Sequence, residues 1–192
     1  MVLILGVLAV VLTVARSWPQ FIRIVVKRDN TGVSVLTWML VMTAHLGWLM
    51  YGILDHVVLL VIVNTLCALG CAAILLRLRP LQYLLVPVVG MPLASVALYG
   101  ISNGALLATV IGLSLVMFVP QVLTVFRAPH HGVSPLTWAL SALSSITWIS
   151  WSIMVGRPLL AAAHYVMLPI ALAILGKTLR RSPVIASEAI TP

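Results

Sequence analysis

The sequence predicts an all-α polytopic membrane protein, with seven transmembrane helices arranged as two parallel three-helix bundles joined by a linker helix (3-1-3). Three observations predict this fold. Hydrophobic residues make up 62% of the 192 residues and charged residues only 7%, whereas a soluble chain carries about a quarter charged residues. Several apolar stretches are long enough to span a bilayer. A stretch of about a hundred residues also occurs twice, as the internal repeat of a larger fold.

The repeat is visible in two matching motifs. The first copy runs from Pro19-Gln20 through a basic loop to Gly-Val-Ser-Val-Leu-Thr-Trp. The second runs from Pro120-Gln121 through another basic loop to Gly-Val-Ser-Pro-Leu-Thr-Trp. The two prolines are 120 − 19 = 101 residues apart. A repeat of this length accommodates three membrane-spanning helices.

The apolar stretches place the helices along the chain. Ser34 and Ser134 stand where N-caps of the second and sixth helices are expected. Pro80 and Pro158 stand at the starts of the fourth and seventh helices, where proline is tolerated. The predicted spans are 2–26, 35–54, 57–76, 81–99, 104–126, 135–155 and 158–176.

The fourth span lies between the two copies of the repeat. Two three-helix units joined directly would point in opposite directions, and one extra crossing restores them to the same direction. The fourth span is therefore interpreted as an inversion linker. The predicted division is a first triple-helix bundle at 1–77, the linker helix at 78–101, a second triple-helix bundle at 102–180 and a cytoplasmic tail at 181–192.

The basic residues gather on one predicted side of the membrane. Of the Lys and Arg residues in the predicted loops, only Arg157 falls on the side of Met1. The positive-inside rule therefore predicts a multi-pass protein with its N-terminus outside and its C-terminus in the cytoplasm. Short loops and a minimal tail favour the cell inner membrane. The same rule explains the net charge of +8, so nucleic-acid binding is not expected. The expected partners are the lipid bilayer and a small-molecule solute, and a homo-oligomer is left open.

Four side chains are expected at one depth in the membrane. Trp48 lies eight residues before the turn at His56 and Asn64 lies eight after it, and Trp148 and His164 flank the matching turn in the same way. Eight residues of helix span about 12 Å, which is close to the midplane. An indole suits the C–H face of a sugar, and an amide both donates and accepts hydrogen bonds. Helix packing is the alternative explanation, but the fourfold match in depth favours a substrate pocket.

Arg16 is a further candidate for this pocket. It lies too deep in the first span to reach the surface easily, and an arginine inside a membrane indicates a functional site. Capping of carbonyls freed by Pro19 is the alternative. Its counterpart in the second copy is Met117, so the charge is one-sided. The predicted pocket also includes His45, Ser144 and Ser145.

Two pairs of residues are predicted to act as hinges. Pro19 and Pro120 each remove a backbone hydrogen bond and are expected to kink the first and fifth spans. Gln20 and Gln121 are placed to satisfy a freed carbonyl. Equivalent bends in two halves suit a rocking bundle, and static kinks are the alternative.

An outer gate is predicted at the two corresponding turns. Asp55 and Arg157 are the clear charges there, and we hypothesise that they pair across the mouth with Tyr51 and Trp151 below them. The alternative is that both are solvated ends of loops.

The acidic residues argue against proton coupling. The three of them, Asp29, Asp55 and Glu188, fall in a loop, at a helix end and in the tail, whereas coupled carriers usually have a carboxylate inside the membrane. His45 or His164 could substitute. We find no nucleophile–base pair and no metal-ligand constellation, so neither an enzyme, a catalytic residue, a metal nor a cofactor is expected.

These motifs together resemble those of a known family. The Pro-Gln pair in the first helix, the Gly-Val-Ser entry to the second, Trp48-x-x-Tyr51-Gly52 and Asn64 resemble the SWEET and SemiSWEET sugar transporters of the PQ-loop group. The resemblance covers 1–77 and, more loosely, 104–176. It implies two triple-helix bundles, alternating access and a central sugar pocket at Trp48, Asn64, Trp148 and His164, the last standing where the family has a second Asn.

The leading hypothesis is facilitated diffusion (uniport) of mono- or disaccharides. The first alternative is a PQ-loop transporter that carries an amino acid or a carboxylate held by Arg16. The second alternative is a seven-helix receptor or scaffold that transports nothing.

Overall fold

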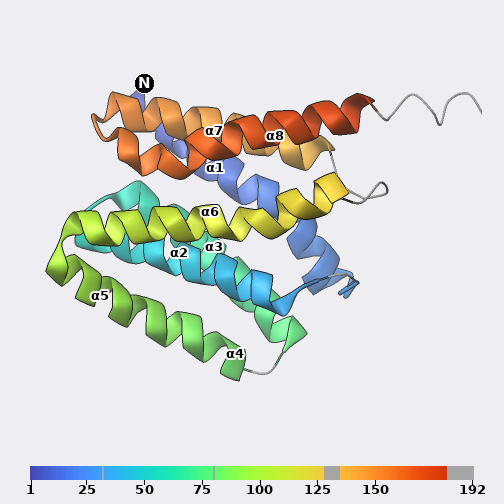
Figure 1. The fold of residues 1–192 in the computed structure, drawn as a ribbon, viewed down its shortest axis with the longest axis horizontal. Helices are drawn as coiled ribbons and strands as arrows, with labels where there is room; N and C mark the ends of the chain where they lie inside the picture. Colours follow the sequence, from blue (N-terminus) through green and yellow to red (C-terminus); the bar gives the residue numbers. More distant parts are fainter. Residues whose placement is uncertain (32, 80, 128–134, 181–192) are drawn as a thin grey trace, which may run out of the picture.

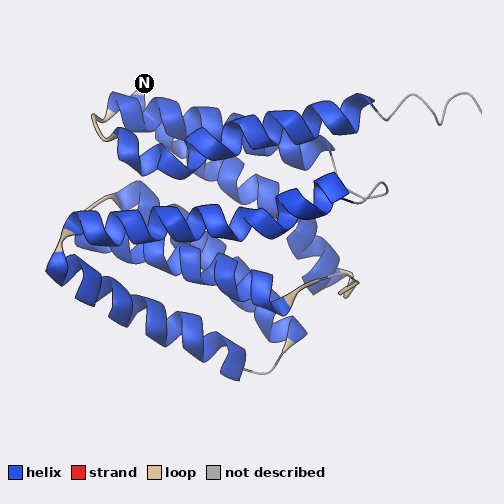
Figure 2. Cartoon of the chain, in the orientation of Figure 1, coloured by secondary structure: helices blue, strands red, loops and turns tan. Residues whose placement is uncertain are grey.

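Helices form every described secondary-structure element of the chain (Figures 1 and 2). The computed structural model describes residues 1–31, 33–79, 81–127 and 135–180, without the side chains of 118–127 and 180. No strand occurs in these ranges, and the predicted tail at 181–192 lies outside them. The helices are α1 (Val2–Phe21), α2 (Val35–Leu54), α3 (Val58–Leu78), α4 (Gln82–Leu85), α5 (Met91–Ile101), α6 (Asn103–Arg127), α7 (Pro135–Met154) and α8 (Ala162–Arg180).

Three short segments of other helix types extend or join these helices. A π-helical turn at Ile22–Val26 continues α1, a second at Val86–Gly90 joins α4 to α5, and a 3-10 turn at Pro158–Ala161 leads into α8. The described chain therefore contains seven helical segments in succession. Each predicted span coincides with one of them to within a few residues, so the predicted helix positions are confirmed.

The ends of the helices follow local sequence signals. The Ser34 hydroxyl accepts a hydrogen bond from the backbone N–H of Thr37 over 3.3 Å, which confirms the predicted N-cap of α2; Ser134 lies outside the described residues. After α2 and α7 the backbone turns through left-handed conformations, with φ 54° at His56 and 71° at Gly156. At both turns an N–H bonds back to the carbonyl five residues earlier, the Schellman pattern of a helix end.

Five helical segments of the described chain are long and apolar enough to cross a membrane. Each is long enough to cross the hydrocarbon core of a bilayer, so these helices are compatible with a multi-pass membrane protein. The part of α6 whose side chains are described, Asn103–Met117, is also apolar but shorter. The five are Val2–Val26, Val35–Leu54, Val58–Leu78, Gln82–Ile101 and Pro158–Leu179.

Helix α7 is less apolar than these five segments because seven of its 20 residues are Ser or Thr. Hydroxyls of this kind often donate to a carbonyl one turn earlier in the same helix. Ser145 donates to the Ser141 carbonyl over 2.9 Å and Thr147 to the Leu143 carbonyl over 3.1 Å. The buried members of the set are Ser141, Ser144, Ser145, Thr147 and Ser152. This helix can therefore bury a polar face in the bundle.

The long helices pack in a closed ring. In order around this ring α1 contacts α3, α3 contacts α2, α2 contacts α6, α6 contacts α8, α8 contacts α7, and α7 contacts α1 again. Helix α5 packs outside the ring, against α2 and α6 (Figure 1). A hydrophobic core that includes Tyr51, Trp148 and Trp151 fills the contact between the helices. The ring brings the beginning of the chain against α7, more than a hundred residues later.

The predicted hinge residues lie in continuous helices. Pro19 is inside α1, which changes to its π-helical turn three residues later, and such turns often accompany a local irregularity. Gln20 is exposed. Pro120 and Gln121 lie in the part of α6 whose side chains are outside the described residues. The hinge role of all four stays a prediction.

Candidate functional site

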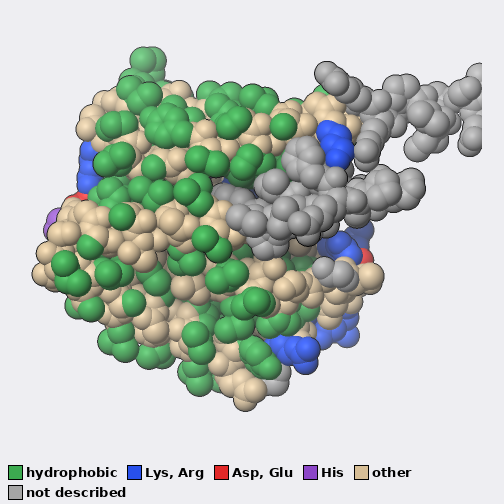
Figure 3. Space-filling view, viewed as in Figure 1, with side chains coloured by type: hydrophobic (Ala, Val, Ile, Leu, Met, Phe, Trp, Pro, Cys, Tyr) green, Lys and Arg blue, Asp and Glu red, His purple; other side chains and the backbone are tan. Residues whose placement is uncertain are grey.

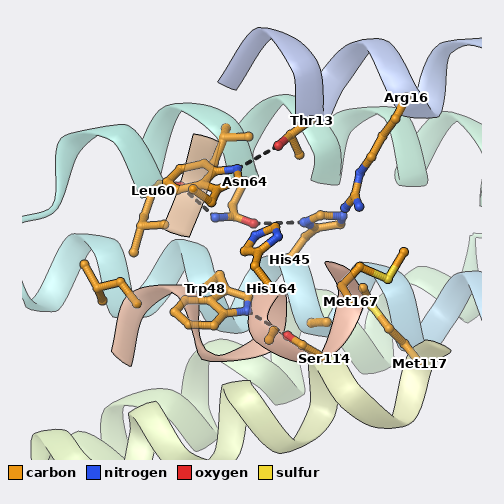
Figure 4. Close-up of a pocket in the computed structure, with 15 residues that line it drawn as sticks. Thr13, Arg16, His45, Trp48, Leu60, Asn64, Ser114, Met117, His164 and Met167 are labelled. Carbon is orange, nitrogen blue, oxygen red and sulfur yellow. Dashed lines mark hydrogen bonds between the residues drawn. The ribbon is translucent and has the colours of Figure 1, made fainter. Parts of the chain in front are cut away.

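A cavity lies at the centre of the helix ring (Figure 4). Its volume is about 70 Å³. A single water needs about 10–15 Å³, so the cavity has room for a small polar solute. Side chains from all six helices of the ring line it. The polar lining residues are Thr13, Arg16, His45, Trp48, Asn64, Ser114, Trp148 and His164.

Two tryptophans are fixed in this cavity by equivalent hydrogen bonds. Trp48 on α2 donates from Nε1 to Ser114 Oγ on α6, and Trp148 on α7 donates from Nε1 to Thr13 Oγ1 on α1, each over 2.8 Å. Each accepting hydroxyl donates in turn to the carbonyl four residues earlier in its own helix. The sequence positions also correspond, because 114 − 13 = 101 and 148 − 48 = 100. Each copy of the repeat therefore places an indole on the first helix of the other copy.

A second pair of equivalent contacts fixes one imidazole in each copy. His45 Nδ1 on α2 lies 2.9 Å from Asn64 Oδ1 on α3, and His164 Nδ1 on α8 lies 3.2 Å from Ser145 Oγ on α7. These positions correspond, because 145 − 45 = 100 and 164 − 64 = 100. The histidine has changed helix between the copies. His164 also stacks on Trp148, with ring centroids 6.0 Å apart and an interplanar angle of 16°.

The partners of these imidazoles decide which ring nitrogen stays available. The Asn64 amide donates from Nδ2 to a carbonyl of α3, so its Oδ1 accepts from His45. The Ser145 hydroxyl donates to a carbonyl of α7, so its oxygen accepts from His164. A neutral imidazole has a single N–H. Both rings therefore carry it on Nδ1, and both have Nε2 left as an acceptor.

The structure brings six of the eight predicted pocket residues to the cavity wall. The other two, Ser144 and Ser145, are fully buried behind it. Ser144 Oγ lies 2.9 Å from Thr13 Oγ1, so both serines hold residues of the wall in place. The six at the wall are Arg16, His45, Trp48, Asn64, Trp148 and His164.

Arg16 is the only described lining residue with a formal charge. Its side chain extends from α1 into the cavity toward His45 (Figure 4). Within the described part of the chain, its guanidinium forms no hydrogen bond or ion pair. The equivalent lining residue from the second copy is Met117. The cavity is therefore symmetric in its aromatic framework and asymmetric in charge.

A polar cluster lies at one end of the ring. The Arg157 guanidinium contacts the Asp55 carboxylate and donates to the Tyr51 hydroxyl over 3.1 Å. Asn103, the first residue of α6, donates from Nδ2 to Asp55 Oδ1 over 2.6 Å. Trp151 is buried in the adjoining core. The structure contains the predicted pairing of Asp55 with Arg157, while its action as a gate stays a prediction.

Sequence reasoning did not assign the two hydroxyl residues that accept the indoles. Thr13 and Ser114 each lie six residues before a Pro-Gln pair. This shared offset, with a small hydroxyl residue in both copies, is the signal that could have found them. Met117 and Met167, which complete the wall beside Arg16 in Figure 4, carry no such signal.

No protein-family model, curated protein or solved structure matches this chain. Functional interpretation therefore starts from the chemistry of the cavity.

Proposed function

We propose that this chain is a membrane carrier that moves small sugars, mono- or disaccharides, by facilitated diffusion and alternating access. The observation that carries the proposal is the pair of indoles, Trp48 and Trp148, held in one cavity by equivalent hydrogen bonds. Indole faces stack on the apolar C–H faces of sugar rings. The imidazoles and the Asn64 amide beside them supply hydrogen-bonding atoms for hydroxyl groups.

The proposed architecture is two parallel three-helix bundles, at 1–77 and 102–180, joined by a linker helix at 78–101. Contacts within each copy are consistent with it, because α3 lies against both α1 and α2, and α8 lies against both α6 and α7. The first helix of each copy, α1 or α6, also packs closely against the second helix of the other, α7 or α2. The position of α5 outside the ring suits a linker. In this arrangement the cavity lies between the bundles, so a rocking motion of one bundle against the other would expose it to one side at a time.

The polar cluster at Asp55 supplies the proposed outer gate. Its ion pair joins the end of α2 to the turn before α8, which belong to different copies of the repeat. The two side chains are 15% and 39% exposed, so opening this end would transfer a partly buried ion pair to water. Separation of the bundles would break the pair.

We orient the carrier by its basic residues, with the N-terminus outside the inner membrane and the C-terminus in the cytoplasm. Figure 3 shows most of the visible Lys and Arg side chains at the end of the bundle opposite the N-terminus. By the positive-inside rule this end faces the cytoplasm. Exposed members at this end are Arg23, Lys27, Arg28, Arg77 and Arg79.

The transport we propose is not coupled to protons. None of the described residues that line the cavity is an Asp or a Glu, and a carboxylate inside the membrane is the usual proton carrier. Solute would then move down its own gradient.

Counterflow of labelled sugars into liposomes containing the purified protein tests this proposal. Uptake should be the same with and without a pH gradient, and Asn64→Ala should remove it. Thr65→Ala is the matched control, because Thr65 is the exposed neighbour of Asn64 on α3. Uptake that follows the pH gradient would contradict uniport and direct attention to His45 or His164. No flux of any solute would contradict transport and favour the receptor or scaffold hypothesis.

A further inference from the structure

The hydrogen-bonding groups of the cavity are unevenly divided between donors and acceptors. Both indole N–H groups are occupied by hydroxyls of the wall, and the hydroxyls of Thr13 and Ser114 donate to backbone carbonyls. The two imidazoles have acceptor nitrogens left. Among the described lining residues, the donors that remain are the second N–H of the Asn64 amide and the guanidinium of Arg16. A guanidinium has five N–H groups.

No carboxylate of the described chain neutralises Arg16. Asp29 is bound by Arg23 in the loop after α1, with Nε and Oδ2 2.8 Å apart. Asp55 is bound by Arg157 and Asn103 at one end of the ring. The cavity therefore contains a cation without a counter-charge from the described residues.

An uncompensated cation away from water is unfavourable, and a bound anion would relieve it. The planar fork of a guanidinium matches the two oxygens of a carboxylate, which can accept two parallel hydrogen bonds. A neutral sugar can accept from Arg16 but leaves its charge unbalanced. A solute with one carboxylate would satisfy both requirements.

We propose that the solute is a sugar acid, a polyhydroxy compound with a single carboxylate that binds Arg16. Its hydroxyls donate to Nε2 of His45 and His164, and the C–H face of its carbon skeleton lies against Trp48 or Trp148. This inference rests on the proposed function and names the class of sugar. It also fixes the orientation of the solute, because the carboxylate must point toward Arg16 on α1.

Equilibrium binding of labelled D-glucuronate and D-glucose to the purified protein tests the inference. The two probes share a ring and differ at one carbon, which is a carboxylate in the first and a hydroxymethyl group in the second. The wild type should bind glucuronate about 10- to 100-fold more tightly, as expected for hydrogen bonds to a charged group. Arg16→Met should abolish that preference, since Met occupies the equivalent position 117. Arg16→Lys should retain part of it.

Arg77→Gln provides the matched control, because it removes an exposed cation of α3 outside the cavity and should leave the preference unchanged. Equal binding of the two probes, or a glucuronate preference that survives Arg16→Met, would overturn the inference. Counterflow of both probes separates it from the proposed function. Flux of glucose without glucuronate would overturn the inference alone. Arg16-dependent binding of glucuronate without flux of either probe would support the site and overturn the carrier.

Discussion

The two copies of the repeat build the same framework and place different charges on it. In both copies an indole on the second helix bonds to a hydroxyl on the first helix of the other copy, and the second helix ends in the same left-handed turn. The charges at the cavity and at the Asp55 end have no such match. Arg16 corresponds to Met117, Asp55 to Val155, and Arg157 to Val57.

This difference separates what the repeat determines from what each copy has acquired alone. The framework needs both copies, because the acceptor of each indole belongs to the other one. Arg16 comes from one copy alone, and the ion pair takes Asp55 from one copy and Arg157 from the other. Arg16 places a charge on one side of the cavity, and the Asp55–Arg157 pair at one end has no equivalent at the corresponding positions, which are Val155 and Val57. The aromatic framework of the cavity is thus symmetric, and its charge is not.

The largest effect is expected when the two indoles are removed in turn. Trp148 is 3% exposed in the core, whereas Trp48 is only partly buried at its edge. Trp148→Ala should destabilise the protein by about 3 kcal/mol, the low end of the range for a buried Trp. The loss is at the low end because lipid tails are as apolar as the protein core, so burying the indole gains little from the hydrophobic effect. Trp48→Ala should destabilise it less, while both weaken solute binding. Thermal unfolding in detergent micelles measures the difference, and equal losses of stability would contradict this distinction between the copies.

Close packing of α2 against α5 and α6 gives the next prediction. A Cβ at Gly47 would lie 2.7 Å from both Met91 Cε and Val110 Cγ1. Gly47→Ala should therefore cost about 1–3 kcal/mol, seen as a lower melting temperature. Gly70→Ala is the matched control on α3, since its Cβ would meet nothing within 4 Å. The second copy has Thr147 at the position equivalent to 47, so a glycine allows this close approach on α2 and none stands at the matching position of α7. A tolerated Gly47→Ala would show that the helices separate easily there.

Neutralising the Asp55–Arg157 ion pair should shift the balance of open and closed states. Asp55→Asn or Arg157→Gln should each favour opening of this end by about 1 kcal/mol, or roughly fivefold. The rate of thiol labelling at Leu160→Cys, a buried lining position, reports the opening once Cys67 and Cys71 are replaced by alanine. An unchanged labelling rate in both variants would show that the ion pair does not hold this end closed.

The ion pair at the opposite end should have the smallest effect. The hydrogen bond from Arg23 holds the pKa of Asp29 well below its ordinary value of 3.8. A lowered pKa contributes stability above the ordinary value and loses it as the pH falls toward the folded-state pKa. Because the side chains are 46% and 45% exposed, Asp29→Asn should change the melting temperature only slightly at pH 7. Any difference from wild type should fade below about pH 4, and a large effect at neutral pH would contradict this ranking.

The positions of the helices could be predicted because hydropathy and caps are local. The apolar stretches end at polar turns, and Ser34 is an N-cap that needs no partner beyond Thr37. The depth of the site was also predictable, since counting eight residues from each turn places Trp48 and Asn64 at one level. That count needs only the geometry of a helix.

Apart from the Asp55–Arg157 pair, the partners across the ring were not predicted, because they depend on which helices become neighbours. Nothing near Trp48 in sequence indicates Ser114, and nothing near Asp55 indicates Asn103. Ser144 and Ser145 were predicted to line the cavity, but each instead forms a hydrogen bond to a residue of the cavity wall. Hydrophobic periodicity cannot distinguish these two places on a helix that is polar on its buried side.

The measurement that tests the central claim most directly is reversible closure of the Asp55 end. Asp55→Cys with Arg157→Cys, in a chain whose native cysteines are replaced by alanine, can be joined by a reducible bis-methanethiosulfonate reagent. Solute counterflow should stop when the cross-link forms and return when it is reduced, while either single cysteine variant should be unaffected by the reagent. Counterflow that continues through a complete cross-link would contradict alternating access through this cavity.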